Sequence, residues 1–266
     1  VYLITRMPLH FVGGLEMSGG FRHQAQNAST NDYSQGLVSA SQKYSANAGD
    51  VALNYKYQAG QKLFIKWDQS YRLPNTDEFW GWNPVAGKPV FNGILKPQIS
   101  QSYSAGGDWN INNTHISASV FQSITQSEIR FDPTSNSNIN TIGNINRTGF
   151  LFDVSSIVFQ NLAIAGGGKL QKSLFDSGAF SGAGVGLSPD LLLNARAQYM
   201  FNSQLSTGLV INYVGSQNYD ADPAIINSLA KMPSYVASDA YINYNIDSWD
   251  MKFIVKNIGG STYATS

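Results

Sequence analysis

Apolar and polar side chains alternate strictly along the C-terminal part of the chain. In the segment 191–201 the odd positions carry leucine, alanine, tyrosine and phenylalanine, whereas the even positions include Asn194, Arg196 and Gln198. After short polar turns the same alternation returns several times within 205–257. Because successive side chains of a strand point to opposite faces, each such segment predicts a strand with one apolar and one polar face.

Alternating segments of this kind predict about twelve strands along the whole chain. Many of them reach the roughly 9–11 residues that a tilted strand needs to cross a membrane. The expected strands lie near residues 1–9, 13–26, 48–58, 61–73, 98–108, 113–131, 138–158, 161–175, 187–202, 205–217, 234–245 and 248–257.

The connections between these strands alternate in length. Long loops are expected near 27–47, 74–97, 176–186 and 218–233, while the connection near 132–137 is short. Short turns on one side and long loops on the other are typical of outer-membrane barrels, in which the long loops are extracellular. The fold class predicted is therefore all-β, a transmembrane antiparallel β-barrel.

Arg196 decides which face of the sheet meets lipid. An arginine on the lipid side at mid-height costs about 2–4 kcal/mol, so the row that contains Arg196 is expected to face the lumen. The residues expected to point outward are Leu193, Ala195, Tyr199, Leu209, Ile211, Met251 and Phe253. Those expected to point inward are Asn194, Arg196, Gln198, Asn212 and Lys252.

Composition supports a membrane wall rather than a soluble core. The 266 residues carry zero formal net charge, and 13% of them are charged, against about 25% in soluble domains. No stretch approaches the roughly 18 consecutive apolar residues of a spanning helix. The chain has no cysteine, which excludes disulfides and thiolate metal sites, and no basic run that would indicate nucleic acid as a partner.

The residues at both ends of the sequence indicate that it is a fragment of a longer chain. Val1 to Thr5 already alternates like a strand and has no signal peptide before it, and the last eight residues read as a loop. An incomplete barrel would leave unpaired strand edges, which are costly in lipid. We therefore expect a fragment whose first and last strands lie far apart instead of closing a ring.

Non-alternating residues between the strands form an ordered series of short motifs. The series begins with Tyr71-Arg72-Leu73-Pro74, Glu78, Asn83-Pro84 and Leu95-Lys96-Pro97, and continues with Tyr103, Gly106, Asn144, Arg147, Gly149, Tyr213-Val214-Gly215, Pro233-Ser234-Tyr235, Asp239, Asn257-Ile258 and Tyr263. This series resembles the barrel of TonB-dependent outer-membrane receptors. Two positions depart from the family pattern, where Gln98 and Leu151 replace glutamates.

The resemblance implies a barrel of about 22 strands, plugged by an N-terminal domain that this chain lacks. It implies that residues 1–266 are part of the barrel, about strands ten to twenty-one, without the last strand. It further implies the cell outer membrane as the location, lipid as surroundings, and a TonB-type energy-transducing protein that engages the missing N-terminal region. No cofactor, metal site or nucleic-acid partner is implied.

The loop 75–92 is the densest group of candidate ligand-binding side chains. Its Trp80, Trp82 and Asn83 offer rigid aromatic area and an amide to an aromatic chelate or a sugar. In a second loop, Tyr219 with Asp220 and Asp222 forms a smaller cluster that could contact ligand or bind a divalent cation. The structural alternatives are a packed loop core or interfacial anchors for the tryptophans, and an ordinary solvated loop for Tyr219. If the loop binds ligand, it should lean over the lumen.

Other motif residues are assigned structural roles. Arg72 and Glu78 are expected to hold a turn, with Arg72 buried below the loop as its anchor. The residues of this structural set are Arg72, Pro74, Glu78, Pro97, Gly149 and Asp239.

No enzyme constellation is present in the sequence, because the three histidines are scattered and the carboxylates are dispersed. The leading interpretation is an active-transport receptor for a scarce nutrient, and family frequency favours a ferric siderophore. The alternatives left open are cobalamin, another metal chelate or an oligosaccharide, a passive porin or structural barrel, and a soluble all-β binding protein.

Overall fold

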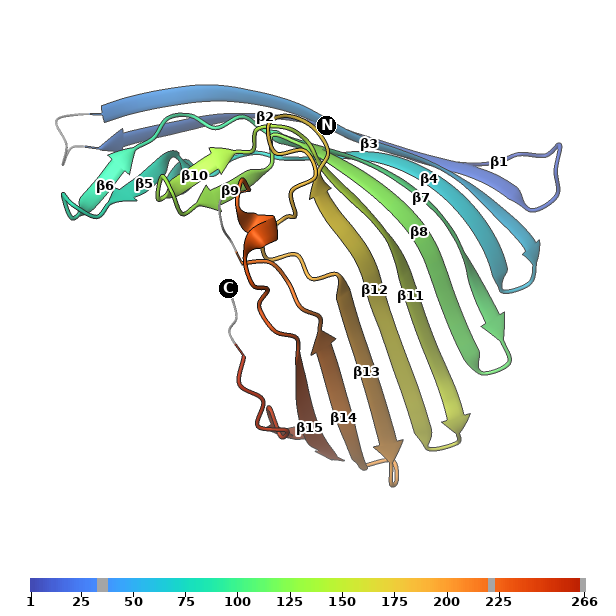
Figure 1. Ribbon diagram of the computed structural model, residues 1–266. Helices are drawn as coiled ribbons and strands as arrows, with labels where there is room; N and C mark the ends of the chain where they lie inside the picture. Colours follow the sequence, from blue (N-terminus) through green and yellow to red (C-terminus); the bar gives the residue numbers. More distant parts are fainter. Residues whose placement is uncertain (33–37, 220–222, 264–266) are drawn as a thin grey trace.

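The computed structural model describes residues 1–32, 38–219 and 223–263. Twelve antiparallel strands form one curved sheet, and each strand lies beside its neighbours in the order of the chain (Figure 1). The number of strands and their antiparallel order confirm the sequence prediction. The strands of the sheet are β1 (Tyr2–Pro8), β2 (Leu15–Asp32), β3 (Val38–Gln58), β4 (Gln61–Arg72), β7 (Gln98–Ile111), β8 (Thr114–Gln126), β11 (Ile145–Phe159), β12 (Leu162–Phe175), β13 (Leu191–Met200), β14 (Leu205–Val214), β15 (Tyr235–Ile246) and β16 (Trp249–Val255).

Smaller elements gather at one end of the sheet, opposite the rim that carries the short turns (Figure 1). Two hairpins, each a separate two-stranded sheet, lie there with two 3-10 helices. None of the helices in the described ranges is long and apolar enough to cross a membrane. The elements are η1 (Thr76–Phe79), β5 (Trp80–Asn83), β6 (Lys88–Phe91), β9 (Ile129–Asp132), β10 (Ser137–Asn140) and η2 (Ile226–Ser228).

Three sequence predictions about this end are wrong. The segment 27–47 is not a long loop, because β2 continues to Asp32 and β3 starts at Val38, paired with each other throughout. The strand expected over 113–131 breaks at Ser127, whose φ of 52° lies in the left-handed region, and the hairpin of β9 and β10 follows. The strand expected over 138–158 is interrupted as well, because β10 ends at Asn140 and β11 starts at Ile145 in a different sheet. The segment 27–47 carries polar residues on both faces, so no alternation of apolar and polar residues predicts a strand there. Such alternation indicates only strands that have one apolar face.

The two faces of the sheet have the predicted chemistry. Arg196 and Gln198 line a cavity of about 380 Å³ together with residues of β7, β8, β11 and β12. A cavity shared by five neighbouring strands of one sheet lies on its concave side, so the Arg196 row faces inward as predicted. On the other face Leu209 and Ile211 are each 37% exposed and Phe253 is 67% exposed. The convex face thus exposes large apolar side chains.

The cross-strand register places Lys62 and Asp108 on the same concave face as Arg196. Lys62 pairs with Asp108 across β4 and β7, with Nζ and Oδ2 2.7 Å apart. Glycine makes room for large rings on the same face: a Cβ on Gly208 would lie 2.3 Å from the ring of Tyr241 on the next strand. The polar wall is therefore built from paired charges and from rings that lie over glycines.

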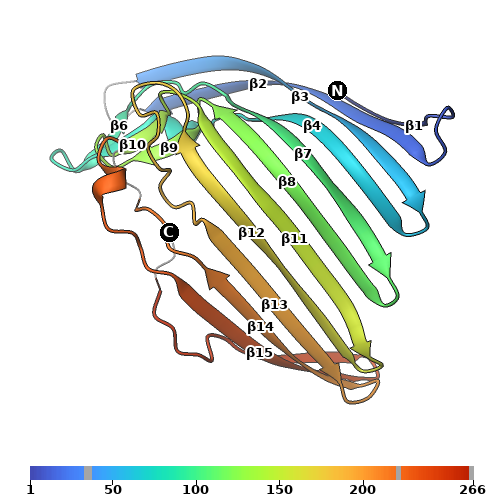
Figure 2. The same cartoon turned by 45° about the vertical axis from the view of Figure 1, so that its right-hand side comes forward.

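The sheet does not close on itself. β1 pairs with β2 and β16 pairs with β15, and neither has a second neighbour within the described residues. Figure 2 shows the curved sheet with β1 at one edge and β15 near the other. This confirms the prediction that the first and last strands do not seal a ring.

Candidate functional site

Two groups of loops pack on the concave face at the end opposite the short turns. The first is the hairpin unit, defined as residues 73–97 with η1, β5 and β6. Its Phe79 is 1% exposed and packs in a cluster with Ala28 of β2 and Tyr44 of β3. Because Ala28 and Tyr44 belong to the row that continues Asp50 and Asp68, the hairpin unit covers the inner side of the sheet. The loop 75–92 leans over the lumen, as expected.

Arg72 and Glu78 hold the turn that leads into the hairpin unit. The Arg72 guanidinium forms an ion pair with the Glu78 carboxylate, whose second oxygen accepts a hydrogen bond from the Asn75 amide at 2.8 Å. Pro74 is fully buried beside this turn. The prediction that Arg72 is buried is wrong, because its side chain is 44% exposed. A long charged side chain such as that of Arg72 can form an ion pair while its charged group stays in contact with water.

The two tryptophans of the hairpin unit have different surroundings. The indole of Trp80 donates a hydrogen bond to Thr30 Oγ1 at 3.1 Å, and its ring meets Phe91 edge to face with centroids 5.3 Å apart. Trp82 is 50% exposed. Asn83 Oδ1 accepts hydrogen bonds from two backbone amides of its own turn. Trp80 and Asn83 thus have structural contacts, whereas Trp82 presents a free aromatic surface.

Trp80→Ala is expected to loosen the hairpin unit by about 1–3 kcal/mol, because the variant loses a partly buried ring and leaves Thr30 without its donor. Faster hydrogen exchange at the amides of β5 and β6 would show this in the full-length protein. Trp82→Ala removes an exposed ring and serves as the matched control with little expected change. Equal loss of protection in both variants would contradict the distinction.

The β9–β10 hairpin joins the hairpin unit to the wall. Trp82 and Asn136 exchange hydrogen bonds, with the Trp82 amide donating to Asn136 O at 3.1 Å and Asn136 Nδ2 donating to Trp82 O at 2.7 Å. Asn140 binds both backbone groups of Lys96 at 2.7 and 3.0 Å, just before Pro97, which is partly buried, and the start of β7. These contacts tie three chain segments together at the mouth.

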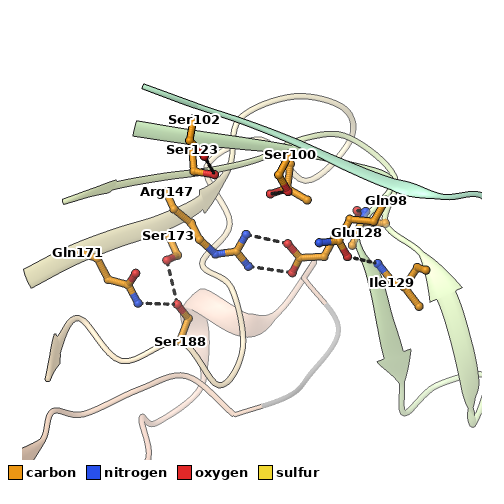
Figure 3. A network of polar contacts seen from close by, with 12 residues as sticks. Gln98, Ser100, Ser102, Ser123, Glu128, Ile129, Arg147, Gln171, Ser173 and Ser188 are labelled. Carbon is orange, nitrogen blue, oxygen red and sulfur yellow. Dashed lines mark hydrogen bonds and ion pairs between the residues drawn. The ribbon is translucent and has the colours of Figure 1, made fainter. Parts of the chain in front are cut away.

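An ion pair fixes the base of the β9–β10 hairpin to β11. Arg147 Nη1 and Nη2 contact the two oxygens of Glu128 at 2.7 and 2.8 Å, and both side chains are largely buried (Figure 3). The Glu128 amide also donates to Thr141 Oγ1 at 3.1 Å. Gln98 Oε1 accepts from the Ile129 amide at 3.2 Å, so the amide that replaces the expected glutamate has a partner. Arg147 is one of the motif residues found in the sequence, whereas Glu128 is not.

The second group is the loop unit, defined as residues 176–190 with the described part of 215–232. Its Val185 and Ile226 pack with Ile145 of β11 and Phe175 of β12 in a buried cluster. Ser188 anchors the unit by accepting a hydrogen bond from Gln171 at 3.2 Å and donating one to Ser173 at 2.8 Å (Figure 3). Tyr219 is 48% exposed. Asp220 and Asp222, the carboxylates proposed beside it, lie outside the described residues.

The motif residues Gly149 and Asp239 have structural contacts. A Cβ on Gly149 would lie 2.8 Å from the ring of Phe121, which crosses over it from β8. Asp239 Oδ1 accepts a hydrogen bond from the Asn257 amide at 2.8 Å, and Tyr235 stacks on Tyr263 with centroids 4.5 Å apart. Four motif residues from 235–263 therefore meet and fix the last described residues to β15.

Asp132 keeps its charge at the tip of β9. Burial alone would raise the pKa of its carboxyl. Hydrogen bonds from the Ser135 hydroxyl and from the Thr134 and Ser135 amides outweigh burial and hold this pKa below its ordinary value. Within the ranges that the structure describes, no group of three or more His, Asp or Glu side chains could hold a metal ion.

The family model described as TonB dependent receptor-like, beta-barrel, matches residues 1–258. A search of curated proteins gives no match. The ferric-catecholate import receptor Fiu from Escherichia coli K12 aligns with a TM-score of 0.71 at 17% identity, over 98% of this chain and 40% of Fiu.

Two other solved structures give a similar alignment. The siderophore receptor PiuA from Acinetobacter baumannii has a TM-score of 0.73 at 17% identity, over 98% of this chain and 38% of PiuA. The copper transporter OprC has a TM-score of 0.67 at 16% identity, over 93% of this chain and 40% of OprC. The chain thus spans about two fifths of these proteins, and the likeness at this identity shows the fold. With a family model matched from residue 1 to 258 and a sheet of the same architecture, the chain belongs to the TonB-dependent receptor family, of whose β-barrel it forms a part.

Proposed function

We propose that this chain is the wall and mouth of an outer-membrane active-transport receptor for a scarce nutrient, with a ferric siderophore as the leading substrate. The receptor draws its energy from a TonB-type protein. That protein engages an N-terminal region outside residues 1–266, where a plug domain fills the lumen. Further strands complete the barrel and pair with the edges of β1 and β16.

The observation that carries this proposal is the packed mouth on a wall of the receptor family. Both the hairpin unit and the loop unit lie on the concave face at one end, tied to the wall by buried clusters. A receptor that captures its substrate needs such side chains above the lumen. The convex apolar face supports the membrane location.

The support for the substrate is less specific than the support for the receptor function. Among the similar structures, Fiu and PiuA are titled a ferric-catecholate import receptor and a siderophore receptor, and OprC a copper transporter. Each imports or transports a metal or its chelate, which favours a metal chelate for this chain. Trp82, Asn83 and Tyr219 remain the candidate contacts, of which Trp82 and Tyr219 are about half exposed.

The test uses the full-length protein and its variant Trp82→Ala. A ring that stacks on the ligand contributes about 0.5–1.5 kcal/mol, so affinity for a ferric siderophore should fall by up to about tenfold. The matched control is Trp249→Ala, since Trp249 is 72% exposed at the opposite rim. Titration of tryptophan fluorescence with a panel of ferric siderophores measures the affinity.

Uptake separates the receptor from a porin. Cells that express the full-length protein should take up the ferric siderophore only while the inner membrane is energised and a TonB-type protein is present. Uptake that continues without either would indicate passive diffusion. Absence of binding across ferric siderophores, with binding of cobalamin or an oligosaccharide instead, would retain the receptor and replace its substrate.

A further inference from the structure

Arg196 differs from the other positive side chains on the concave face of the twelve wall strands. Lys62 forms an ion pair with Asp108, and Lys169 lies over the ring of Phe121, with Nζ 5.3 Å from the ring centroid. Every other lysine or arginine on this face likewise pairs with a carboxylate or lies over an aromatic ring. Arg196 makes no such contact with any residue that the structure describes.

Arg196 lines one side of a cavity in the inner wall, close to the rim of the short turns. This cavity of about 380 Å³, which we call the wall hollow, is also lined by residues 112–113 of the β7–β8 turn. The register sets Ser155 and Ala165 side by side between His115 and Arg196. Three strand spacings of about 4.8 Å separate the two outer residues by roughly 14 Å. The small side chains between them leave the floor open.

Two further polar side chains of the wall hollow can still form hydrogen bonds. Gln198 lies on the same face as Arg196, and Ser155 lies on the floor. Neither side chain has a hydrogen-bond partner among the described residues. By contrast, His115 Nδ1 lies 2.8 Å from Asn110 Oδ1. The wall hollow thus combines a guanidinium, an amide and a hydroxyl that the wall leaves unpaired.

The wall does not neutralise Arg196. Among the described residues, no carboxylate lines the wall hollow. Asp239 lies in the same row two strands away, beyond Val210, and its Oδ1 accepts a hydrogen bond from the Asn257 amide at 2.8 Å. Asp153 lies two residues before Ser155 on β11 and does not line the wall hollow either.

The charge of the wall hollow does not depend on the residues that the structure leaves undescribed. These are 33–37, 220–222 and 264–266, and none of them adjoins a lining residue in the sequence. The positive charge of Arg196 is therefore available to a group that enters the wall hollow from the lumen.

We propose that the wall hollow binds a carboxylate, with Arg196 as its ionic contact and Gln198 and Ser155 as hydrogen-bonding neighbours. A guanidinium presents parallel N–H groups that match the two oxygens of a carboxylate. The volume falls within the roughly 300–1,000 Å³ of small-molecule sites, so the groups attached to the carboxylate fit as well. The carboxylate belongs either to an aspartate or glutamate of a domain inside the lumen or to a passing substrate. The inference rests on the proposed function, which supplies both occupants.

The test is carbodiimide coupling in the full-length protein that carries Arg196→Lys. The carbodiimide activates a carboxylate, which then forms an amide bond with the lysine Nζ, with net loss of water. Because bond formation needs the two groups in contact, the yield at position 196 should exceed that of a lysine outside the wall hollow by about tenfold or more. Mass spectrometry of the digested protein identifies the coupled group.

Two arms of the experiment distinguish the sources. Without added ligand, coupling of position 196 to a peptide from outside residues 1–266 assigns the carboxylate to a domain of the longer protein. With galacturonate added, a galacturonate adduct at position 196 assigns it to a small molecule. Galactose has the same ring without the carboxylate and should give no adduct. Either result supports the carboxylate site.

Asn194→Lys is the matched control. Asn194 lies on the same face of β13, two residues before Arg196, and does not line the wall hollow. The variant adds the same amine at nearly the same depth. Its coupling to carboxylates from outside the wall should be lower than that of Arg196→Lys by about tenfold or more.

Three outcomes would overturn the inference and leave the receptor assignment standing. The first is coupling of position 196 to Asp239 or Asp153, which would give Arg196 a partner within the wall. The second is equal coupling of Arg196→Lys and Asn194→Lys to groups from outside the wall. The third is no coupling at position 196 in either arm. Uptake that needs no energised membrane would instead count against the proposed function itself.

Discussion

Leu209→Arg should impair assembly of the full-length protein in lipid, whereas Val210→Arg, one residue further on, should be tolerated. Leu209 belongs to the convex apolar row and lies near the middle of β14 (Leu205–Val214). An arginine facing lipid at mid-height costs about 2–4 kcal/mol, equivalent to roughly 30- to 1,000-fold in the folding equilibrium.

The control works because Val210 points to the other face. In the register it lies between Arg196 of β13 and Asp239 of β15. An arginine there meets water, and the Asp239 carboxylate on one side offsets the like charge of Arg196 on the other. Folding into lipid vesicles, followed by the mobility shift between unheated and heated samples, gives the folded fraction. If Val210→Arg were the more damaging variant, the assignment of the two faces would be reversed.

Glu128→Gln should release the β9–β10 hairpin from the wall. The variant leaves the Arg147 guanidinium with 23% of its side chain exposed and without its carboxylate. Charge-assisted hydrogen bonds contribute about 1.5–3 kcal/mol, and an unpaired charge that is largely buried adds its desolvation cost. Hydrogen exchange at the amides of residues 129–140 should therefore become roughly 10- to 100-fold faster.

A double-mutant cycle with Arg147→Gln identifies the source of this effect. The double variant removes both charges, so its exchange should be slower than that of Glu128→Gln alone by about tenfold. Tryptophan fluorescence from the hairpin unit should change little, because Trp80 has its own contacts with Thr30 and Phe91. Strictly additive effects in the cycle would mean that the two side chains do not act as a pair.

Part of the candidate site was predictable from the chain and part was not. The turn of Arg72, Pro74 and Glu78 lies within seven residues, so its motif indicates the structure directly. Trp82 and Trp80 are equally prominent in the sequence, yet one is half exposed and the other is tied to Thr30, fifty residues away. Which ring is free depends on β2 extending far enough to meet the hairpin unit.

A cavity of about 230 Å³ beside Ile142, where the β9–β10 hairpin meets the loop unit, had no sequence signal at all. Its lining comes from β9, β10, β12 and four connecting segments, and each contributes one or two ordinary residues. Likewise Glu128 meets Arg147 only because β8 breaks at Ser127 and a hairpin is inserted before β11. Contacts of this kind depend on where loops fold back. The local pattern of apolar and polar residues in the sequence does not indicate this.

The sequence by itself determined the twelve strands of the wall, their antiparallel order and the direction of each face. Lipid on one side and water on the other force a period of two, and short turns force neighbours in the chain to pair. Tertiary structure alone decided how far β2 and β3 extend, that Arg72 stays exposed, and which side chains close over the mouth. At the mouth, both faces of the chain contact water or other loops, so no boundary between lipid and water imposes an alternating pattern. Packing between distant segments determines the structure there.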